Sequence, residues 1–205
     1  SAASDVYKRQ LELLATDQMD PMVTTTVGTG ELLAEALQRG AKRIWLAIGG
    51  SATVDGGIGV AEALGWALLD EKDRAVSPNG AGLRNIRRIK RPECGNYSEV
   101  KVEVLCDVDN PLLGVRGAAH VFGPQKGATA EMVEQLEAGL INFANVIESD
   151  LGKDVRDIPG AGAAGGLGAG AVAFLNAKLV SGIDAVMDLS LIHISEPTRR
   201  TPISY

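Results

Sequence analysis

The sequence contains few cysteines and no long apolar run, and each deficit excludes a class of protein. Only Cys94 and Cys106 are cysteines among 205 residues. They are too few and too isolated for a disulfide framework or a thiolate metal site, so we expect a reducing compartment. No apolar stretch reaches the roughly 18 residues of a membrane-spanning helix, and no signal peptide is visible. We therefore expect a cytoplasmic protein with no membrane partner.

Positive charge and histidine are also scarce. Lysine and arginine number 20 against 26 acidic residues, which leaves a net charge of −6. Such a protein repels the phosphate backbone of DNA or RNA, so we expect no nucleic-acid partner. Of the two histidines, His120 lies in an apolar segment and is expected to pack or cap rather than act as a base. The Gly-x-x-x-x-Gly-Lys-[Ser/Thr] pattern of P-loop kinases does not occur.

Glycine, in contrast, is abundant, with 25 residues that cluster at predicted turns and so favour ligand-facing loops over low complexity. The most informative cluster lies between a strand-like run at 44–48 and a helix-like run at 57–69. A Gly-rich turn there is either a tight connection or a phosphate seat, because it offers small residues and free amides to an anion. Its candidate binding residues are Gly49, Gly50, Ser51, Thr53, Gly56 and Gly57.

Two other patterns predict different chemistry. Residues 160–165 match the Gly-x-Gly-x-x-Gly pattern of dinucleotide-binding proteins, with Asp184 about 20 residues onward where a ribose-binding acid would lie. Pro159 disrupts the strand that this motif requires, so a nicotinamide oxidoreductase is an alternative and not the leading hypothesis. Residues 49–53 nearly match a nucleophile elbow, but Thr53 replaces its second glycine and histidines are few, which argues against a serine hydrolase.

Hydrophobic periodicity predicts an α/β arrangement in the first half of the chain. Residues 31–39 have apolar positions at helical spacing and stop at Gly40. They lead into the strand at 44–48 and then into the predicted helix at 57–69. This order is typical of a doubly wound layer, in which ligands bind beyond the carboxyl ends of the strands.

Three further elements are predicted in the second half. Residues 100–105 alternate like a strand. Residues 128–151 indicate one long helix, with Thr129 as its N-cap. The Gly-rich segment 160–166 leads into a small-residue helix at 167–179. The apolar stripe of the long helix is expected to consist of Met132, Leu136, Leu140, Phe143 and Ile147.

A few charged side chains are candidates for chemistry. Phosphoryl transfer needs Mg²⁺ held by one or two carboxylates and a group that orients the attacking hydroxyl. Asp107 ends a predicted strand and is interpreted as functional. Asp55 could equally cap the following helix, and Asp109 could equally hold the turn at Asn110-Pro111. Lys126 lies in a stiff Gly/Pro loop and is the best candidate cation for a carboxylate or a transferring phosphate.

Several Gly/Pro/Asp blocks occur in one order that resembles the bacterial-type glycerate kinases. The blocks are residues 48–57, 106–112, 122–128 and 159–166, with 20–32 upstream. The resemblance implies ATP-dependent phosphorylation of D-glycerate, with ATP and Mg²⁺ as cofactors and small molecules as partners. It also implies an α/β fold, with a Rossmann-like layer and an inserted second α/β lobe, incomplete at both ends.

The resemblance runs from about residue 11 to 189 and implies a division of the chain. The expected parts are a non-native extension at 1–10, a Rossmann-like segment at 11–75, an inserted lobe at 76–160, a Gly-rich loop and helix at 161–190, and a non-native tail at 191–205. The N-terminal strand of the family and its C-terminal Thr-Gly-Glu-Gly-type motif have no counterpart here. We therefore expect a fragment that is inactive alone, and a non-catalytic binding fragment is the further alternative.

The resemblance finally implies roles for the candidate residues. Asp107, Lys126 and Asp55 are expected to be catalytic, and Asp107 also to be the metal ligand. The amides and hydroxyls of the 49–57 loop are expected to hold anionic oxygens. The other expected substrate- or phosphate-binding residues are Asn110, Gln125, Gly160, Gly162 and Gly165.

Overall fold

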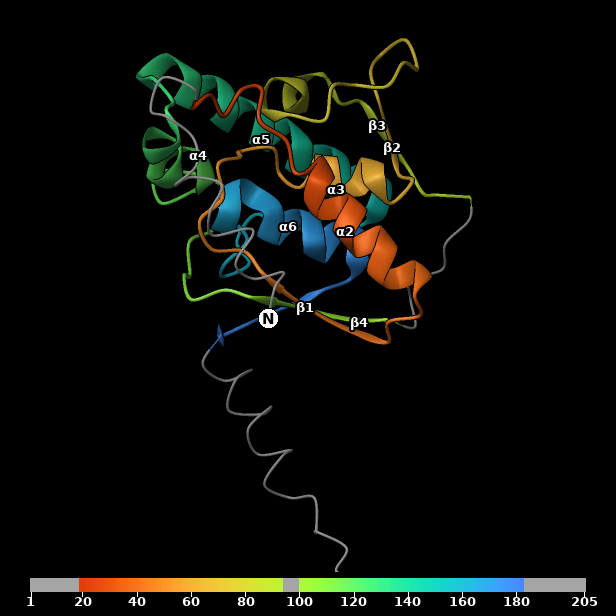
Figure 1. The fold of residues 1–205 in the computed structure, drawn as a ribbon. Helices are drawn as coiled ribbons and strands as arrows, with labels where there is room; N and C mark the ends of the chain where they lie inside the picture. Colours follow the sequence, from red (N-terminus) through yellow and green to blue (C-terminus); the bar gives the residue numbers. More distant parts are fainter. Residues whose placement is uncertain (1–18, 94–99, 183–205) are drawn as a thin grey trace, which may run out of the picture.

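A parallel sheet forms one side of the fold (Figure 1). The computed structural model describes residues 19–93 and 100–182. The strands β1 (Arg43–Ala47), β4 (Lys101–Leu105) and β5 (Lys178–Val180) pair in the order β1-β4-β5. In this register Val104 lies between Leu46 and Leu179, and all three face the helices. The predicted α/β class is thereby confirmed.

Helices cover the inner face of this sheet in layers. α6 (Ala163–Leu175) packs on β4 and β5, α3 (Ile58–Ala63) packs on α6, and α2 (Val27–Gln38) packs on α3. The long α5 (Ala130–Leu151) lies beyond them, at the far side from the sheet (Figure 1). The buried side chains of all these layers form one continuous hydrophobic cluster, and the predicted boundaries of the two lobes stay predictions.

Shorter elements flank α5. The remaining ones are β2 (Ala67–Leu69), the 3₁₀ turn η2 (Gly80–Asn85), β3 (Arg88–Lys90), α4 (Ala118–Phe122) and the 3₁₀ turn η4 (Pro124–Lys126). β2 and β3 form an antiparallel pair, and both η2 and β3 pack against α5. η4 follows α4 after one residue, so Lys126 lies seven residues after the buried Ala119.

The long helix follows its sequence pattern closely. The hydroxyl of Thr129 accepts a hydrogen bond of 3.2 Å from the amide of Met132, as an N-cap does. Gly152 ends the helix in the left-handed region. The predicted stripe is confirmed: four of its residues are fully buried and Met132 is half-buried. No helix among the described residues combines the length and the apolar character that crossing a bilayer requires.

Two predicted helices are too long at their C-terminal ends. α3 ends at Ala63, and residues 67–69 form β2; α6 ends at Leu175, and residues 178–180 form β5. In both cases a residue in the left-handed region, Gly65 or Asn176, turns the chain. Short apolar runs suit a helix or a buried strand equally, so periodicity alone did not separate them.

A buried carboxylate joins the starts of α2 and α3. Asp55 Oδ2 accepts hydrogen bonds of 2.8 Å from both the amide and the hydroxyl of Thr26, the N-cap of α2. Asp55 Oδ1 accepts one of 3.0 Å from the amide of Gly57, the N-cap of α3. The Thr26 hydroxyl in turn accepts from the amide of Val60 at 3.1 Å. Asp55 therefore holds the residues at which both helices begin, whereas the sequence had suggested such a role only at the second of them.

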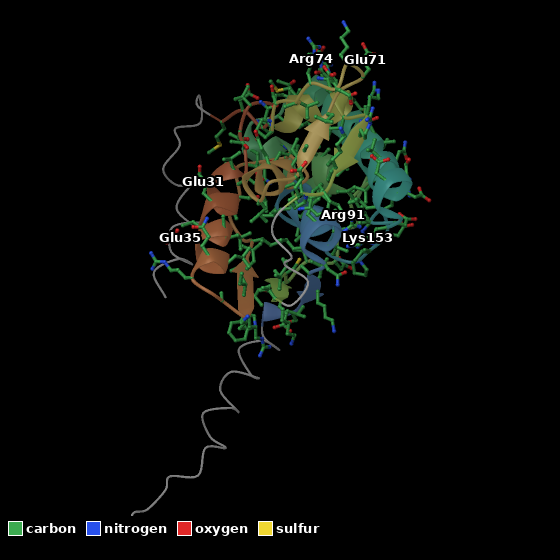
Figure 2. All side chains as sticks on the ribbon, turned by 90° about the vertical axis from the view of Figure 1, so that its right-hand side faces the viewer. Glu31, Glu35, Glu71, Arg74, Arg91 and Lys153 are labelled. Atoms are coloured by element: carbon green, nitrogen blue, oxygen red, sulfur yellow. The ribbon has the colours of Figure 1, made fainter. Side chains whose placement is uncertain are left out.

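Lys153 caps the C-terminal end of α6. Lys153 Nζ donates hydrogen bonds of 2.8 Å and 2.9 Å to the carbonyl oxygens of Val172 and Ala173, in the last turn of α6. Burial lowers the pKa of Lys153, and the nearby Arg91 lowers it further. Figure 2 shows Lys153 and Arg91 on the same side of the molecule. The guanidinium carbon of Arg91 lies 5.6 Å from the ring centre of Trp66. Buried or half-buried polar side chains thus hold the starts of α2 and α3 and the end of α6.

Close packing of α2 on α3 gives the first prediction. A Cβ at Gly30 would lie 2.6 Å from Ala63 Cβ and 2.8 Å from Val60 Cα, whereas a Cβ at Gly28 meets nothing within 4 Å. We expect Gly28→Ala to stabilise the fold by about 0.5–1 kcal/mol through helix propensity. We expect Gly30→Ala to destabilise it by roughly 1–3 kcal/mol because the helices must separate. Urea unfolding of the matched pair measures both, and equal midpoints would contradict the packing described.

Candidate functional site

A cavity of about 260 Å³ opens where β1 and β4 end. Doubly wound sheets bind ligands at this edge, because loops from neighbouring strands converge there. The lining residues are Ile48, Gly49, Gly50, Ser51, Leu105, Cys106, Asp107, Val108, Phe122, Gln125, Lys126, Ala163 and Ala164. The structure thus brings together the Gly49–Ser51 turn, Asp107, Gln125 and Lys126, which the sequence placed in separate motifs.

Lys126 is the buried cation of this cavity. Its side chain comes from η4, and it is only 2% exposed. Nζ donates a hydrogen bond of 2.8 Å to Ser51 Oγ and one of 2.6 Å to the carbonyl oxygen of Thr53. Both acceptors belong to the loop after β1, so η4 and this loop are joined through one amine. The Thr53 hydroxyl is buried and has no hydrogen-bond partner among the described residues.

Burial changes the proton affinity of the Lys126 amine. Desolvation lowers the pKa of Lys126 from 10.5 to about 7, and the negative charge of Asp55 opposes part of this change. Burial likewise raises the pKa of Asp55, against the hydrogen bonds from Thr26 and Gly57. Asp55 is 0% exposed and does not line the cavity. It acts on the cavity through Lys126 and the loop, and its catalytic role stays a prediction.

The loop after β4 supplies the opposite wall. Asp107 is exposed, and its Oδ1 accepts a hydrogen bond of 2.9 Å from the amide of Gly182. Cys106 Sγ donates to the carbonyl oxygen of Val108 at 3.1 Å, and burial raises the pKa of its thiol. An ordinary thiol of this kind is a poor nucleophile, so the wall offers one carboxylate and one unreactive sulfur.

Apart from Gly49 and Gly50, the predicted binding glycines do not line the cavity, and two of them lie directly against backbone. A Cβ at Gly165 would lie 2.0 Å from the carbonyl oxygen of Thr53, and one at Gly162 would lie 2.2 Å from that of Pro111. Gly160 similarly approaches Cys106 Sγ. These glycines let residues 160–165, which include the first residues of α6, pack onto the two strand-end loops. This segment follows a turn and not a strand, which removes the structural context of the dinucleotide-binding motif.

The remaining predicted residues have local structural partners. Gly56 lies against Phe143, and Gly57 lies against Leu167. Asn110 Nδ2 donates a hydrogen bond of 2.8 Å to the carbonyl oxygen of Arg116 and so closes a turn. None of these three lines the cavity, and their contribution to ligand binding stays a prediction.

Sequence reasoning did not select several lining residues. Cys106, Phe122, Ala163 and Ala164 have apolar or weakly polar side chains, so nothing in their chemistry points to a site. Ala164 has a φ of 53°, which is uncommon for a residue other than glycine. Its strained backbone interrupts the first turn of α6 and presents that turn to the cavity. The neighbouring glycines were the only sequence signal for this arrangement.

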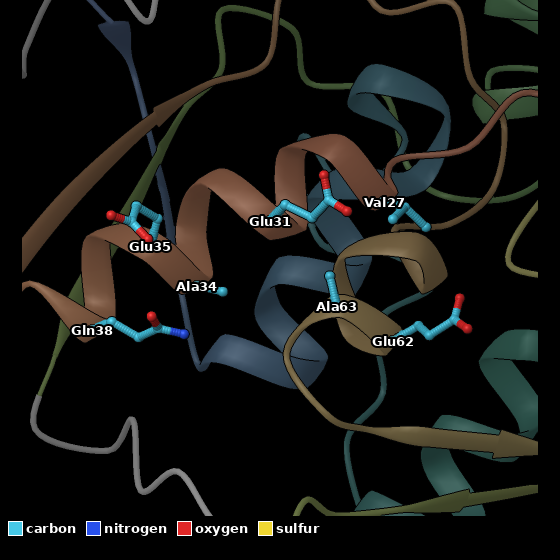
Figure 3. A pocket seen from close by; sticks show the side chains of 7 residues that line it. All are labelled: Val27, Glu31, Ala34, Glu35, Gln38, Glu62 and Ala63. Carbon is cyan, nitrogen blue, oxygen red and sulfur yellow. The ribbon is translucent and has the colours of Figure 1, made fainter.

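A second hollow, of about 620 Å³, lies between α2 and α3 (Figure 3). Its lining includes the carboxylates of Glu31, Glu35 and Glu62 but no lysine or arginine. Figure 2 shows Glu31 and Glu35 on the outer face of α2. Such a surface repels an anion. Of these two hollows, the smaller one, which contains Lys126, is therefore better suited to a negatively charged ligand.

The cavity could hold a magnesium ion through one carboxylate, that of Asp107. No group of three or more histidine, cysteine or acidic side chains suited to holding a metal occurs within residues 19–93 and 100–182. Asp107 is the acidic residue of the cavity lining. Mg²⁺ is commonly held by one or two carboxylates together with substrate phosphates and water, so Asp107 fits as a single protein ligand.

Comparison with known proteins identifies the family of this chain. The family described as "Glycerate kinase family" matches residues 10–197. The chain is 49% identical over 184 residues to a glycerate kinase of Halalkalibacterium halodurans, which covers 89% of this chain and 48% of that one. It is 46% identical over 177 residues to the glycerate 2-kinase of Escherichia coli K12, with 86% and 46% covered.

A solved structure gives the same result. The crystal structure of a protein described as glycerate kinase 2 of Salmonella typhimurium LT2 superposes with a TM-score of 0.85 at 45% identity. It covers 90% of this chain and 50% of that chain. The chain therefore belongs to the glycerate kinase family, which confirms the predicted resemblance. It spans about half the length of the curated relatives it matches.

The buried lysine predicts a characteristic pH dependence of stability. Because the pKa of Lys126 is lower in the folded chain than its ordinary value, the unfolded chain binds the extra proton between about pH 7 and pH 10. The contribution of Lys126 to the free energy of unfolding should therefore rise with pH across this window, by at most about 1.4 kcal/mol per pH unit. Urea unfolding of the wild type and Lys126→Met at pH 6 to 9 measures this difference.

The matched control is Lys90→Met, because Lys90 is exposed on β3. Its difference from the wild type should stay flat over the same pH range. If the free energies of unfolding of the wild type and Lys126→Met changed in parallel with pH, the pKa of Lys126 would not be lowered in the folded chain.

Proposed function

We propose that the protein containing this chain transfers the terminal phosphoryl group of ATP to D-glycerate. The observation that carries the proposal is the buried Lys126 amine bonded to Ser51 in a cavity at the carboxyl ends of two parallel strands. Membership of the glycerate kinase family supports the choice of substrate. A cytoplasmic location, where ATP is abundant and Cys106 stays a free thiol, agrees with this role.

The size and charge of the cavity favour the smaller substrate. Its volume of about 260 Å³ lies below the roughly 300–1,000 Å³ of pockets that enclose drug-sized ligands. A three-carbon acid and the phosphoryl group in transfer suit this space better than a whole nucleotide. We assign the cavity to glycerate and to the terminal phosphate of ATP.

The residues divide the work by their chemistry. The amides of Gly49 and Gly50 and the hydroxyl of Ser51 hold anionic oxygens, and Gln125 donates from the other wall. Lys126 offsets negative charge in a site with little water, where such an interaction is strong. Asp107 orients the attacking hydroxyl or holds Mg²⁺. When bound, Mg²⁺ would bridge phosphate oxygens and neutralise the charge that develops on them.

A chimera provides the direct test of the activity. This chain replaces the segment that it matches in the glycerate kinase of Bacillus subtilis, which is 48% identical over 179 residues. We expect the purified chimera to form ADP from ATP only when glycerate is present, and to release phosphoglycerate. A chimera that unfolds cooperatively on heating but phosphorylates no glycerate would contradict the proposal.

Removing the buried amine should reduce turnover. For Lys126→Ala in the chimera we expect a loss of one to three orders of magnitude in kcat, which corresponds to roughly 1.4–4 kcal/mol of transition-state stabilisation. The protein should remain folded, because the desolvated amine opposes folding and its removal offsets part of the lost packing. Lys90→Ala is the matched control and should retain full turnover. Unchanged kinetics in Lys126→Ala would remove Lys126 from the site.

Neutralising Asp107 should separate its two possible tasks. Asp107→Asn is expected to lose activity in either case. If Asp107 orients glycerate, the variant should bind MgATP almost normally. If Asp107 holds the metal, its binding of MgATP should weaken strongly. Isothermal titration with MgATP beside steady-state kinetics distinguishes the two cases. Wild-type turnover would show that Asp107 only anchors Gly182 at the end of β5.

A further inference from the structure

We infer that Ala164 is a specificity-determining residue of the cavity, and that its methyl group limits the acid substrate to three carbons. This role rests on the proposed function, because it concerns which acid the same site accepts. Two observations support it: the backbone conformation of Ala164 and its place in the cavity lining. The chain carries a methyl group at a position where glycine would be free of strain.

Three consecutive residues at the start of α6 adopt the left-handed conformation. Ala164, Gly165 and Gly166 have φ values of 53°, 70° and 89°. This region is unfavourable for a residue with a Cβ, because the Cβ comes too close to the following carbonyl oxygen. Glycine has no Cβ and adopts the conformation freely. Ala164 is therefore the member of this turn that keeps a side chain at an energetic cost.

Two other described residues that are not glycine share this conformation. They are Asp73 and Asn176, with φ values of 56° and 52°. Aspartate and asparagine are the residues that tolerate it best, because their short polar side chains can form local hydrogen bonds. The methyl group of Ala164 has no polar atom and cannot offset the strain in this way. The reason for an alanine here must therefore lie in what its methyl group contacts.

The space around the turn differs between Ala164 and the two glycines. A Cβ at Gly165 would overlap the carbonyl oxygen of Thr53, and one at Gly166 would lie 3.0 Å from Gly56 Cα. Backbone therefore leaves no room for a side chain at either glycine. Ala164 lines the cavity, whereas neither glycine does. The Ala164 methyl group is thus the side-chain atom that this turn can contribute to the cavity.

A methyl group at this place reduces the room for a longer acid. The cavity measures about 260 Å³, and its lining includes the apolar side chains of Ile48, Leu105, Val108 and Phe122. D-Erythronate, a four-carbon acid, has one CHOH group more than D-glycerate. The Ala164 methyl group occupies space that this group would need and offers its hydroxyl no hydrogen bond. We therefore expect the cavity to favour the three-carbon acid.

Packing by itself gives a different expectation. Ala164 is 9% exposed and also belongs to the hydrophobic cluster of the core. If the methyl group served packing only, its removal would lower the stability of the fold and leave the choice of acid unchanged. A role in the cavity predicts the reverse, because glycine relieves the backbone strain and leaves more space for the acid.

The first experiment measures selectivity in the chimera, as the ratio of kcat/KM for D-glycerate to kcat/KM for D-erythronate. One carbon in a close-fitting pocket changes kcat/KM by roughly 10- to 200-fold. We therefore expect Ala164→Gly to lower the ratio at least about tenfold. Ala164→Ser keeps the Cβ and fills more of the cavity. We expect it to lower kcat/KM for glycerate without lowering the ratio.

The matched control is Asn176→Gly. Asn176 has the same left-handed conformation at the other end of α6 and does not line the cavity. Both glycine variants remove strain, so both should keep a Tm at or above that of the wild type. The ratio should change in Ala164→Gly alone. A ratio within about threefold of the wild type in an active Ala164→Gly chimera, or an equal change in Asn176→Gly, would overturn the specificity role.

The second experiment does not depend on turnover. With alanine labelled at ¹³Cβ, the Ala164 methyl signal of the chimera is identified by its absence from Ala164→Gly. We expect this signal to shift when D-glycerate binds. The signal of Ala173, which is buried in α6 and does not line the cavity, should stay in place. An unmoved Ala164 signal in the glycerate-bound chimera would overturn the role of its methyl group.

The outcomes separate the two proposals. A folded wild-type chimera that binds glycerate without phosphorylating it removes the proposed function, and the Ala164 signal still tests the specificity role. A folded chimera that does not bind glycerate overturns both. An active chimera whose Ala164→Gly variant keeps the wild-type selectivity overturns the role of Ala164 alone. If Ala164→Gly fails to fold, the methyl group serves packing and the specificity role is again overturned.

Discussion

The fold of the site depends on one buried carboxylate. Asp55 accepts three hydrogen bonds that together hold the first turns of α2 and α3 and the loop between β1 and α3. A buried charge without such partners costs several kcal/mol, so this loop is stable in one shape only. That shape places Ser51 and the carbonyl oxygen of Thr53 at bonding distance from Lys126. The geometry of the cavity therefore depends on a residue that does not line it.

Small residues bring the walls of the cavity together. Gly165 and Gly170 pack onto the backbone of Thr53 and Gly56, and the amide of Gly56 donates to the carbonyl oxygen of Gly165 at 3.0 Å. Backbones at this distance leave no room for a Cβ. Glycines thus have two different places in this region: Gly49 and Gly50 line the cavity, and Gly165 and Gly170 allow loops from distant parts of the sequence to meet.

The sequence was a good guide to regular elements and a weaker guide to where they end. β1, β4 and α5 follow their patterns, because each combines a consistent period with clear signals at its ends. β2 and β5 were predicted as helix, because three-residue strands contain too few positions to establish a period. Several loops selected from the sequence line one cavity, and the function of this cavity as the binding site stays a prediction. The burial of Lys126 was not predictable, since it depends on contacts with Ser51 and Thr53, more than 70 residues away.

A lysine in such a place makes the site a local weak point of the fold. Keeping the Lys126 amine away from water opposes folding, and its hydrogen bonds to Ser51 and Thr53 offset only part of this cost. Selection for heat resistance alone would replace Lys126 with an apolar side chain of similar length. Retaining the lysine is a stability–activity trade-off, so a family member adapted to high temperature should gain its stability elsewhere, for example in the α2–α3 contact or on the surface of α5.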